Sequence, residues 1–358
     1  MSRDGTSRIA GTGSFLPPSV LSNADLYQRK SIQEAFDVER ARSSLKNGED
    51  PSSLTPVEVF DRWARQVTGI QERRVVGVQD DLTTEVMCAK AAEAALDRAG
   101  MAASDVDMIL VASVTPADNV PNAACTVGHL LENPRAGGFT LNGACTGFVH
   151  ALATAHALIH AGMATNVLAI AGDTLTRITN YRDPTTAVLF SDGAAAAVVT
   201  RSSDPGILGP PFFSADYARK HLFIVGQGWE TPGEPAPKLK MGGGPRVLRR
   251  AIMAMEHAGS QALDRAGLDW SSVDLVVPHQ ANLRITRGLE AQSALQGARV
   301  IHTIERYGNC SAATVGIALD ETLRGVHGQI PDPARIVLTA VGGGYTTAGL
   351  AMDVRGTG

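Results

Sequence analysis

The octapeptide Leu141–Phe148, LNGACTGF, marks a strand-to-helix turn with Cys145 at its centre. Residues 138–141 predict a short buried strand before the turn, and apolar side chains recur at helical spacing over residues 148–158 after it. Cys145 is therefore expected at the first turn of a helix. There the free backbone N–H groups and the positive end of the helix dipole would stabilise a thiolate and lower the pKa of the thiol. The alternative is that Cys145 is a small apolar residue of the core.

Composition excludes several classes of protein. The 358-residue chain is 44% hydrophobic, which is enough for a large core or two fused units. A formal charge of -4 and a pI near 6.1 predict no general attraction to nucleic acid or to membranes. The four cysteines form no CxxC pair, and no apolar run reaches the length of a membrane span. We therefore expect a soluble cytoplasmic protein that binds neither nucleic acid nor membrane.

An internal repeat links the two halves of the chain. Residues 95–107 read ALDRAGMAASDVD and residues 262–274 read ALDRAGLDWSSVD, an offset of 262 − 95 = 167 residues with nine of the thirteen positions identical. Each copy predicts a helix that ends at glycine, a short loop and an apolar strand. The repeat predicts a duplicated α/β fold with an N-terminal half at 1–200 and a C-terminal half at 201–358.

The other strand signals follow the same order in both halves. At the offset of the repeat, Cys145 corresponds to Ala312, so an active site between the halves would take groups from both. The predicted strands cover residues 8–16, 108–114, 167–171 and 194–199 in the first half, and 275–278, 300–303, 336–341 and 350–354 in the second.

Residues 27–55 are charged and predict helices in the first half; the family resemblance given below implies that they are a helical insertion. Ser31 and Glu34 have the spacing of a capping box, which predicts a helix that ends near Lys46-Asn47-Gly48. Thr55 and Glu58 form a second such pair, with proline at the first helical position of the next helix. The insertion is expected to influence selection of the substrate or carrier.

Two polar residues follow strand signals of the second half. His279 lies just past the apolar run 275–278, at the strand edge where open α/β sheets bind ligands. Asn309 lies at a second strand-to-helix turn. The structural alternatives are a hydrogen-bonded loop histidine and a helix cap. His156 and His160 are four residues apart, but no third ligand accompanies them, and we expect no metal site.

Four stretches together resemble one known family. NGACTGF (142–148), PHQANLRI (278–285), RYGNCSAA (306–313) and AVGGGYTTAG (340–349), in this order, are similar to the β-ketoacyl–acyl-carrier-protein synthase III family of the thiolase superfamily. The resemblance implies the thiolase fold, an α/β architecture in which duplicated βα halves form a five-layered αβαβα sandwich, usually as a homodimer. It implies that Cys145 is the nucleophile, with His279 and Asn309 as its polar partners and Gly343 as the second oxyanion donor beside the Cys145 amide.

The resemblance also implies a reaction. An acyl primer on coenzyme A or an acyl carrier protein would be transferred to Cys145, and a malonyl-carrier thioester would lose CO2 to give an enolate that attacks the acyl-enzyme. This decarboxylative Claisen condensation belongs to fatty-acid or polyketide biosynthesis. It needs no cofactor besides the coenzyme A or phosphopantetheine thioesters that are its substrates.

Single residues distinguish this chain from two neighbouring families of the superfamily. Thiolases carry a second catalytic cysteine before the C-terminal glycines, where this chain has Val341, and elongating ketoacyl synthases have a second histidine where this chain has Asn309. Two alternatives stay open. The first is acyl transfer from Cys145 to another acceptor without decarboxylative condensation, and the second is a non-catalytic partner subunit of a synthase pair.

The substrate contacts depart from the family pattern. Trp63 matches the residue that stacks on the adenine of coenzyme A, but Val67 replaces the arginine on the other side of that adenine. Arg177 and Asn282 match contacts to phosphate and pantetheine. Val120 replaces a phenylalanine that closes the partner subunit's tunnel to long primers. We therefore expect an acyl donor longer or bulkier than acetyl, delivered on a carrier protein.

Overall fold

Two five-stranded sheets form the frame of the molecule. The computed structural model describes residues 6–46, 51–77, 79–204, 206–216, 239, 245–295 and 297–355. The first sheet has the order β1 (Thr6–Phe15), β7 (Asp192–Ser202), β6 (Asn166–Thr174), β4 (Met108–Ala112) and β5 (Gly137–Leu141). The second has the order β10 (Arg299–Val300), β9 (Leu275–Pro278), β11 (Ala334–Gly342), β12 (Thr346–Val354) and β8 (Ile207–Ala215).

The two sheets have the same topology. In the first, β5, β4 and β6 are parallel and β7 and β1 continue antiparallel; in the second, β10, β9 and β11 are parallel and β12 and β8 continue antiparallel. The first strand along the chain in each half, β1 or β8, lies at one edge of its sheet, and the third, β5 or β10, lies at the other edge. The second, fourth and fifth strands of the two halves also occupy equivalent places. The duplication predicted from the repeat is confirmed.

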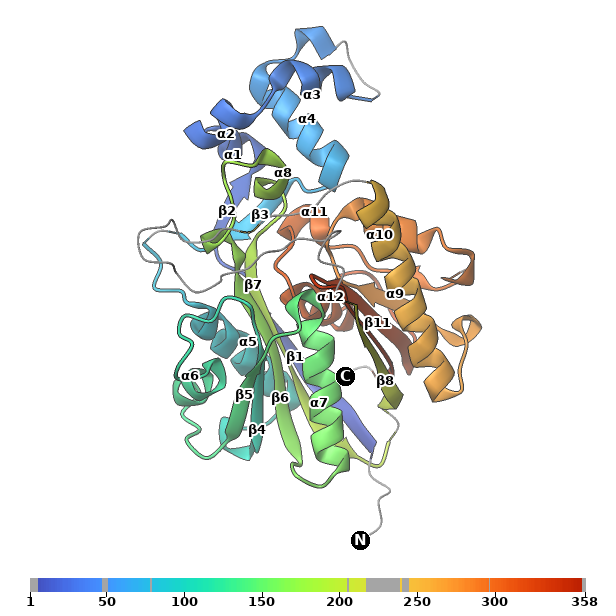
Figure 1. Cartoon of the computed structure of the whole chain (residues 1–358). Helices are drawn as coiled ribbons and strands as arrows, with labels where there is room; N and C mark the ends of the chain where they lie inside the picture. Colours follow the sequence, from blue (N-terminus) through green and yellow to red (C-terminus); the bar gives the residue numbers. More distant parts are fainter. Residues whose placement is uncertain are drawn as a thin grey trace.

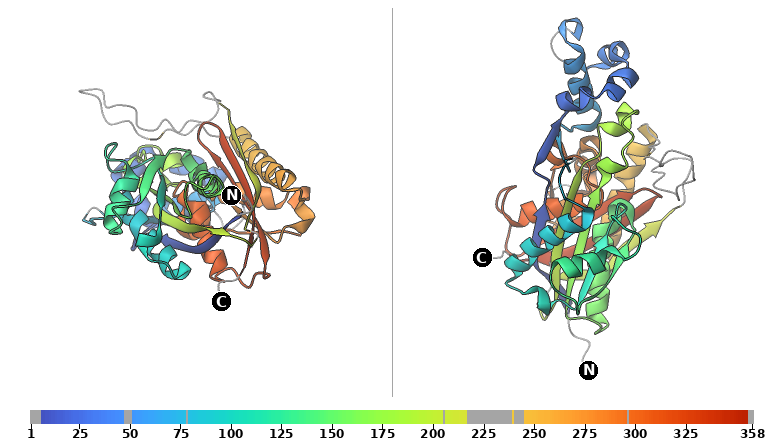
Figure 2. Two further views of the ribbon diagram at one scale, coloured as in Figure 1. Left: turned by 90° about the horizontal axis from the view of Figure 1, so that it is seen from below. Right: turned by 90° about the vertical axis from the view of Figure 1, so that its left-hand side faces the viewer.

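Helices and sheets alternate in five layers (Figures 1 and 2). The outer layers contain α5 (Thr84–Ala99) and α6 (Ala123–Leu130) on the first sheet, and α9 (Pro245–Ala266) and α10 (Leu283–Glu290) on the second. Between the sheets lie α7 (Gly147–His160) and α12 (Ala313–Leu323). Their apolar side chains are buried against both sheets, and each fully buried one, such as Phe148 or Leu152, contributes about 1.5–3 kcal/mol. The chain has the predicted αβαβα architecture.

The helical insertion projects from one end of the sandwich (Figure 1). It contains α2 (Lys30–Ala35), α3 (Val38–Ser44) and a 3₁₀ turn (Pro51–Ser53), which pack with the preceding α1 (Asn23–Tyr27) against α4 (Pro56–Thr68). Phe36 of the insertion lies 4.9 Å from the ring of Phe60 and 5.0 Å from that of Trp63, measured between ring centroids. The short strands β2 (Ser19–Ser22) and β3 (Glu72–Val75) pair at its base. The insertion therefore packs into an apolar cluster that it shares with α4 and with residues 187–188.

Several local predictions differ from the structure. The strand before Cys145 is not buried: β5 is an edge strand, and Phe139 on it is 37% exposed. The Ser31–Glu34 pair does not cap α2, because the helix already begins at Lys30, with Arg29 in the N-cap position. The chain leaves α2 at Phe36 and begins α3 after Asp37, whose carboxylate accepts a hydrogen bond from the Arg40 N–H. Asn47 and Gly48, near the predicted helix end, lie outside the described residues. The second capping pair is confirmed, since the Glu58 carboxylate accepts hydrogen bonds from the N–H and O–H of Thr55.

The other helical segments of the described residues are short. They are α8 (Pro184–Ala187), α11 (Ile304–Tyr307), the 3₁₀ turn Ala144–Thr146 that leads into α7, and the 3₁₀ turns Ala103–Asp105, Leu175–Arg177, Trp270–Ser272 and Ser293–Leu295. Among the helices of the described ranges, none combines the length and the apolar character that a bilayer span requires.

Candidate active site

Cys145 lies where the chain passes from β5 into α7. Ala144, directly before it, has φ 49°, a left-handed conformation that costs a non-glycine residue about 1–3 kcal/mol. The turn directs the chain from the sheet edge into the layer between the sheets, and Cys145 is only 6% exposed there. Gly147 opens the helix at a position where a Cβ atom would meet Ala312 Cβ at 3.1 Å and Ala112 Cβ at 2.8 Å. The cysteine thus lies at the contact of the two halves.

The second half repeats this turn before α12. Ser311 has φ 55°, and its distance from Ala144 along the chain, 311 − 144 = 167 residues, equals the offset of the sequence repeat. Asn309 lies two residues before Ser311, and its Oδ1 accepts a hydrogen bond from the Ser311 N–H at 2.9 Å. This bond fixes the orientation of the Asn309 side chain and leaves its Nδ2 as the group available to a substrate.

Ser311 and Thr314 join the residues that the sequence identified. The Ser311 hydroxyl lies 3.8 Å from the Cys145 sulfur. Thr314 Oγ1 lies 2.9 Å from the carbonyl oxygen of Ser311 and 2.7 Å from Nδ1 of His279. His279 follows the end of β9, where its backbone N–H donates to the backbone carbonyl of Thr339 at 2.8 Å. One hydrogen-bonded group therefore contains Cys145, His279 and the Asn309–Ser311 turn.

The glycine loop between β11 and β12 closes the other side of the Cys145 turn. A Cβ atom on Gly342 would lie 3.0 Å from the Cys145 nitrogen and 3.2 Å from the carbonyl oxygen of Gly143. Thr346, after the loop, donates to that same carbonyl at 3.2 Å. Gly343 is the next residue of the loop, one position from the glycine that contacts the Cys145 turn.

Burial dominates the electrostatics of the site. It raises the pKa of the Cys145 thiol to about 12, although hydrogen bonds from Ser311 and the local backbone oppose this rise. The expected lowering of this pKa is therefore wrong for the resting site, because a thiolate without a compensating group would be poorly solvated there. Burial also lowers the pKa of His279 to about 3, so its imidazole is neutral at pH 7.

The expected substrate contacts lie around the insertion and on the surface. The Trp63 ring packs against Phe36, and Asn282 caps α10 while its Nδ2 donates to the Val67 carbonyl at 2.9 Å. Arg177 is exposed and donates to the carbonyl of Leu82 at 3.0 Å. Val120 is 88% exposed, so it packs little against its own chain.

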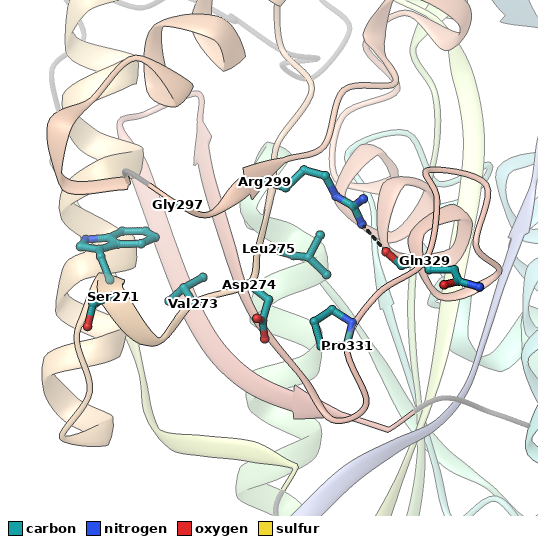
Figure 3. Close-up of a pocket in the computed structure, with 9 residues that line it drawn as sticks. Ser271, Val273, Asp274, Leu275, Gly297, Arg299, Gln329 and Pro331 are labelled. Carbon is teal, nitrogen blue, oxygen red and sulfur yellow. Dashed lines mark hydrogen bonds between the residues drawn. The ribbon is translucent and has the colours of Figure 1, made fainter.

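A separate concavity lies at the other end of β9 (Figure 3). Asp274 and Leu275 line it where β9 begins, whereas His279 follows the end of that strand. The guanidinium of Arg299 points across it and donates to the carbonyl of Gln329 at 3.2 Å. This concavity is therefore distinct from the Cys145 site.

Sequence reasoning missed Ser311, Thr314 and Asp173, a buried carboxylate at the end of β6. A usable signal exists for Ser311, because the 167-residue offset aligns it with the residue before Cys145. Thr314 and Asp173 lie in apolar runs with no spacing that predicts a role.

A cysteine at a helix entrance, a neutral imidazole, a side-chain amide and a glycine loop, all at the junction of duplicated halves, define a condensing acyltransferase of the thiolase fold. The chain matches the family model described as 3-oxoacyl-[acyl-carrier-protein (ACP)] synthase III over residues 139–215 and the model of its C-terminal part over residues 263–354. A β-ketoacyl-[acyl-carrier-protein] synthase III from Xanthomonas campestris pv. campestris is 37% identical over 352 residues, 97% of this chain and 98% of the relative. The chain belongs to the β-ketoacyl-[acyl-carrier-protein] synthase III family.

Solved structures agree with this assignment. The 3-oxoacyl-[acyl-carrier-protein] synthase III from Aquifex aeolicus VF5 is 31% identical, with a TM-score of 0.81 over 97% of this chain and 100% of that one. The priming β-ketosynthase of the R1128 polyketide biosynthetic pathway is also 31% identical, with a TM-score of 0.83 over 99% and 97% of the two chains. The thiolase fold is therefore shared along nearly the whole chain.

Proposed function

We propose that Cys145 carries the acyl group in a decarboxylative Claisen condensation between an acyl thioester primer and a malonyl-carrier thioester. The chain is a condensing acyltransferase of fatty-acid or polyketide biosynthesis, similar to β-ketoacyl-[acyl-carrier-protein] synthase III. The observation that carries the proposal is the hydrogen-bonded group that joins the Cys145 sulfur, the Asn309–Ser311 turn and His279.

The first half-reaction uses the helix entrance and the glycine loop. The Cys145 sulfur attacks the carbonyl carbon of the primer thioester, and the carrier thiolate leaves when the tetrahedral intermediate collapses. The negative oxygen of that intermediate needs fixed N–H donors, and the backbone amides of Cys145 and Gly343 are the pair that we propose for it. Gly342, packed against the Cys145 nitrogen, supports the loop in this place.

The second half-reaction uses the two groups that their neighbours leave available. Nδ1 of His279 is engaged by Thr314 and Oδ1 of Asn309 by the Ser311 amide, so Nε2 and Nδ2 are left for the malonyl thioester oxygen. The Thr314 hydroxyl donates to the Ser311 carbonyl in the resting site. If it turns to donate to Nδ1 instead, the imidazole proton is on Nε2, which is the tautomer that the condensation step needs. As the bond to CO2 breaks, its electron pair forms an enolate, and both donors stabilise the enolate oxygen. The enolate carbon then bonds to the acyl carbon, and Cys145 leaves as the thiolate.

An exposed basic surface supports an acyl carrier protein as partner. Arg249 and Arg250 on α9 and Arg284 and Arg287 on α10 are all exposed. Helices α9 and α10 pack together, and Arg284 lies two residues after Asn282, which contacts the end of α4. Four guanidinium groups on this surface fit the phosphate of a phosphopantetheine arm and an acidic carrier.

The free edge of the first sheet supports a homodimer. Strand β5 ends this sheet, so one row of its backbone groups is available to a second copy. Apolar side chains surround the edge: Phe139 is 37% exposed, Leu130 39% and Val120 88%. The start of α6 is tied to β5, because the Ala123 N–H donates to Thr140 Oγ1 at 3.0 Å.

All four cysteines are free thiols, which fits the cytoplasmic location that we propose.

The reaction is tested by following Cys145 and CO2 separately. Incubation with octanoyl carrier protein is expected to add one octanoyl group to Cys145, detected by peptide mass spectrometry. Addition of malonyl carrier protein is then expected to release one CO2 per β-ketoacyl product. Transfer of the octanoyl group to an added acceptor without CO2 release would instead establish the alternative, acyl transfer without condensation.

The acyl donor is expected to be longer than acetyl and bound to a carrier. Val120 leaves room for several methylenes, each contributing about 0.8 kcal/mol when buried. Phe36 packs on Trp63, and Val67 provides no cation, so adenine stacking is poorly supported. With donors from acetyl to decanoyl on coenzyme A and on carrier protein, we expect the highest kcat/KM for a medium-chain carrier thioester.

The matched variant for this prediction is Val120→Phe. It should lower kcat/KM for the longer donors by about tenfold or more and leave acetyl transfer unchanged, because a ring would fill the space of several methylenes. Light scattering checks the dimer in the same samples. Acetyl-coenzyme A as the best donor, with no change of chain-length preference in the variant, would refute the prediction.

A further inference from the structure

The hydroxyl of Thr314 has three hydrogen-bond partners but only one proton. Its oxygen lies 2.7 Å from Nδ1 of His279, 2.9 Å from the carbonyl oxygen of Ser311 and 3.2 Å from the backbone nitrogen of Gln280. The N–H of Gln280 can only donate, so it occupies one lone pair of the hydroxyl oxygen. The carbonyl can only accept, whereas Nδ1 of a neutral imidazole either donates or accepts. The hydroxyl proton can therefore be donated to Ser311 or to His279, but not to both.

Both arrangements of this hydroxyl leave its neighbours hydrogen-bonded. When it donates to Ser311, as in the resting site, Nδ1 carries the imidazole proton and donates it to the second lone pair of the Thr314 oxygen. When it donates to Nδ1, the imidazole proton is on Nε2. The Ser311 carbonyl then still has a partner, because it also accepts from the backbone N–H of Thr314 at 3.3 Å. The two arrangements therefore differ chiefly in the tautomer of His279.

The groups around the hydroxyl are fixed, so the hydroxyl proton is the part that can turn. The backbone N–H of His279 is bound to the carbonyl of Thr339 at 2.8 Å, and the Gln280 side chain makes three hydrogen bonds of 2.8–3.0 Å to nearby backbone groups. Thr314, His279 and Gln280 are 2%, 1% and 0% exposed, so bulk water does not compete with the hydroxyl for Nδ1. Rotation about the C–O bond of Thr314 moves only the proton and leaves every heavy atom in place.

We propose that Thr314 sets the tautomer of His279 by turning its hydroxyl from the Ser311 carbonyl to Nδ1 when the malonyl thioester binds. At rest, Nε2 carries a lone pair, which would repel the oxygen of the thioester. In the bound state Nε2 carries the proton and donates it to that oxygen as the enolate forms. One proton leaves Nδ1 and one binds Nε2, both exchanged with water, so the ring is neutral before and after. Thr314 is a positioning residue in this step, and the inference rests on the proposed role of His279 in condensation.

The tautomer is measured directly by NMR, from the ¹⁵N chemical shifts of the His279 ring in the full-length protein. His279→Ala identifies the ring signals among those of the nine histidines. The probe is malonyl carrier protein with an amide in place of the thioester, which keeps the carbonyl oxygen that Nε2 is proposed to meet. Wild-type protein should have the proton on Nδ1 without the probe and on Nε2 with the probe. A proton on Nε2 in the substrate-free protein, or a tautomer that bound probe leaves unchanged, would overturn the proposal.

Thr314→Val removes the hydroxyl with little change in side-chain volume. A methyl group cannot accept from Nδ1, so a proton there would be a buried donor without a partner, and the proton should stay on Nε2 with and without the probe. Release of CO2 should fall about tenfold, because the ring loses the hydrogen bond that orients it. Acylation of Cys145 should change by less than about twofold. Thr314→Ser keeps a hydroxyl and should restore both the change of tautomer and, to within about threefold, the rate of CO2 release.

Thr322→Val is the matched control, because Thr322 is a buried threonine of the same helix whose hydroxyl donates to the Ala318 carbonyl at 2.6 Å. It should change neither the tautomer of His279 nor the release of CO2. A Thr314→Val protein whose tautomer still changes with the probe would overturn the proposal. If Thr314→Val does not fold, the spectra of wild type and Thr314→Ser decide. The substrate-free tautomer is measured without turnover, whereas failure of the proposed function would appear as absence of malonyl-dependent CO2 release by wild-type protein.

Discussion

Cys145→Ala is expected to abolish acyl-enzyme formation and to lower condensation by at least about 10⁴-fold. The variant removes the atom that forms the covalent intermediate, and the neighbouring Ser311 hydroxyl cannot replace it, because it is a far weaker nucleophile at neutral pH. The protein should remain folded, since alanine fits a site where Cys145 is almost fully buried among small residues. Steady-state turnover and intact mass after incubation with the acyl donor measure the two effects.

Cys125→Ala is the matched control for this prediction. Cys125 is exposed, whereas the other three cysteines are buried, so alkylating reagents can reach it. It has no proposed part in turnover. The control variant should keep wild-type activity and should still accept one acyl group. Recovery of the acyl group on Cys88, Cys125 or Cys310 of the wild-type protein would show that Cys145 is not the nucleophile.

The repeat made the overall fold predictable. Both copies place a short loop and an apolar strand after a helix, and β4 and β9 indeed occupy the same place in their sheets. Central strands are readable because they are buried on both faces and form continuous apolar runs. Strand β8 was missed because it lies at a sheet edge and contains Pro210 and Pro211, which are unusual in a strand interior. Edge strand β5 was placed correctly, but its exposure depends on the sheet order, which a local pattern does not contain.

The proximity of the candidate site residues could be predicted where a residue type is chemically rare in its position. Cys145 and His279 each follow a strand and precede a helix, whereas Asn309 follows α11 and not the strand that the sequence predicts before it. The structure places the three in one hydrogen-bonded group. Ser311, Thr314 and Asp173 were not recognised, because hydroxyls and single carboxylates have many structural uses. The pKa of Cys145 was wrong for a related reason: the helix start is visible in the sequence, whereas the burial that raises the pKa comes from the packing of two distant halves.

His279→Ala and Asn309→Ala are each expected to lower the decarboxylation of malonyl-carrier thioester by about 10²–10³-fold, because each removes one donor to the enolate oxygen. Acylation of Cys145 should change by less than about threefold, since neither side chain is assigned to the thioester of the primer. Rapid-quench measurement of acyl-enzyme formation and of CO2 release separates the two half-reactions. Both variants should be measured at saturating acyl donor, so that loss of CO2 reports only the second half-reaction.

The pH dependence provides an independent check on His279. Burial lowers its pKa from 6.5 to about 3, so the imidazole stays neutral from pH 5 to pH 8 and decarboxylation should have no inflection near pH 6.5 from this group. Protonation of the imidazole occurs only as the pH falls toward 3, so its charge does not change over the range in which decarboxylation is measured. A decline of CO2 release as the pH rises through 6.5, absent from His279→Ala, would show that the imidazole titrates normally and works as an acid. Normal decarboxylation by both variants, together with failure to form the acyl-enzyme, would assign the two residues to the first half-reaction instead.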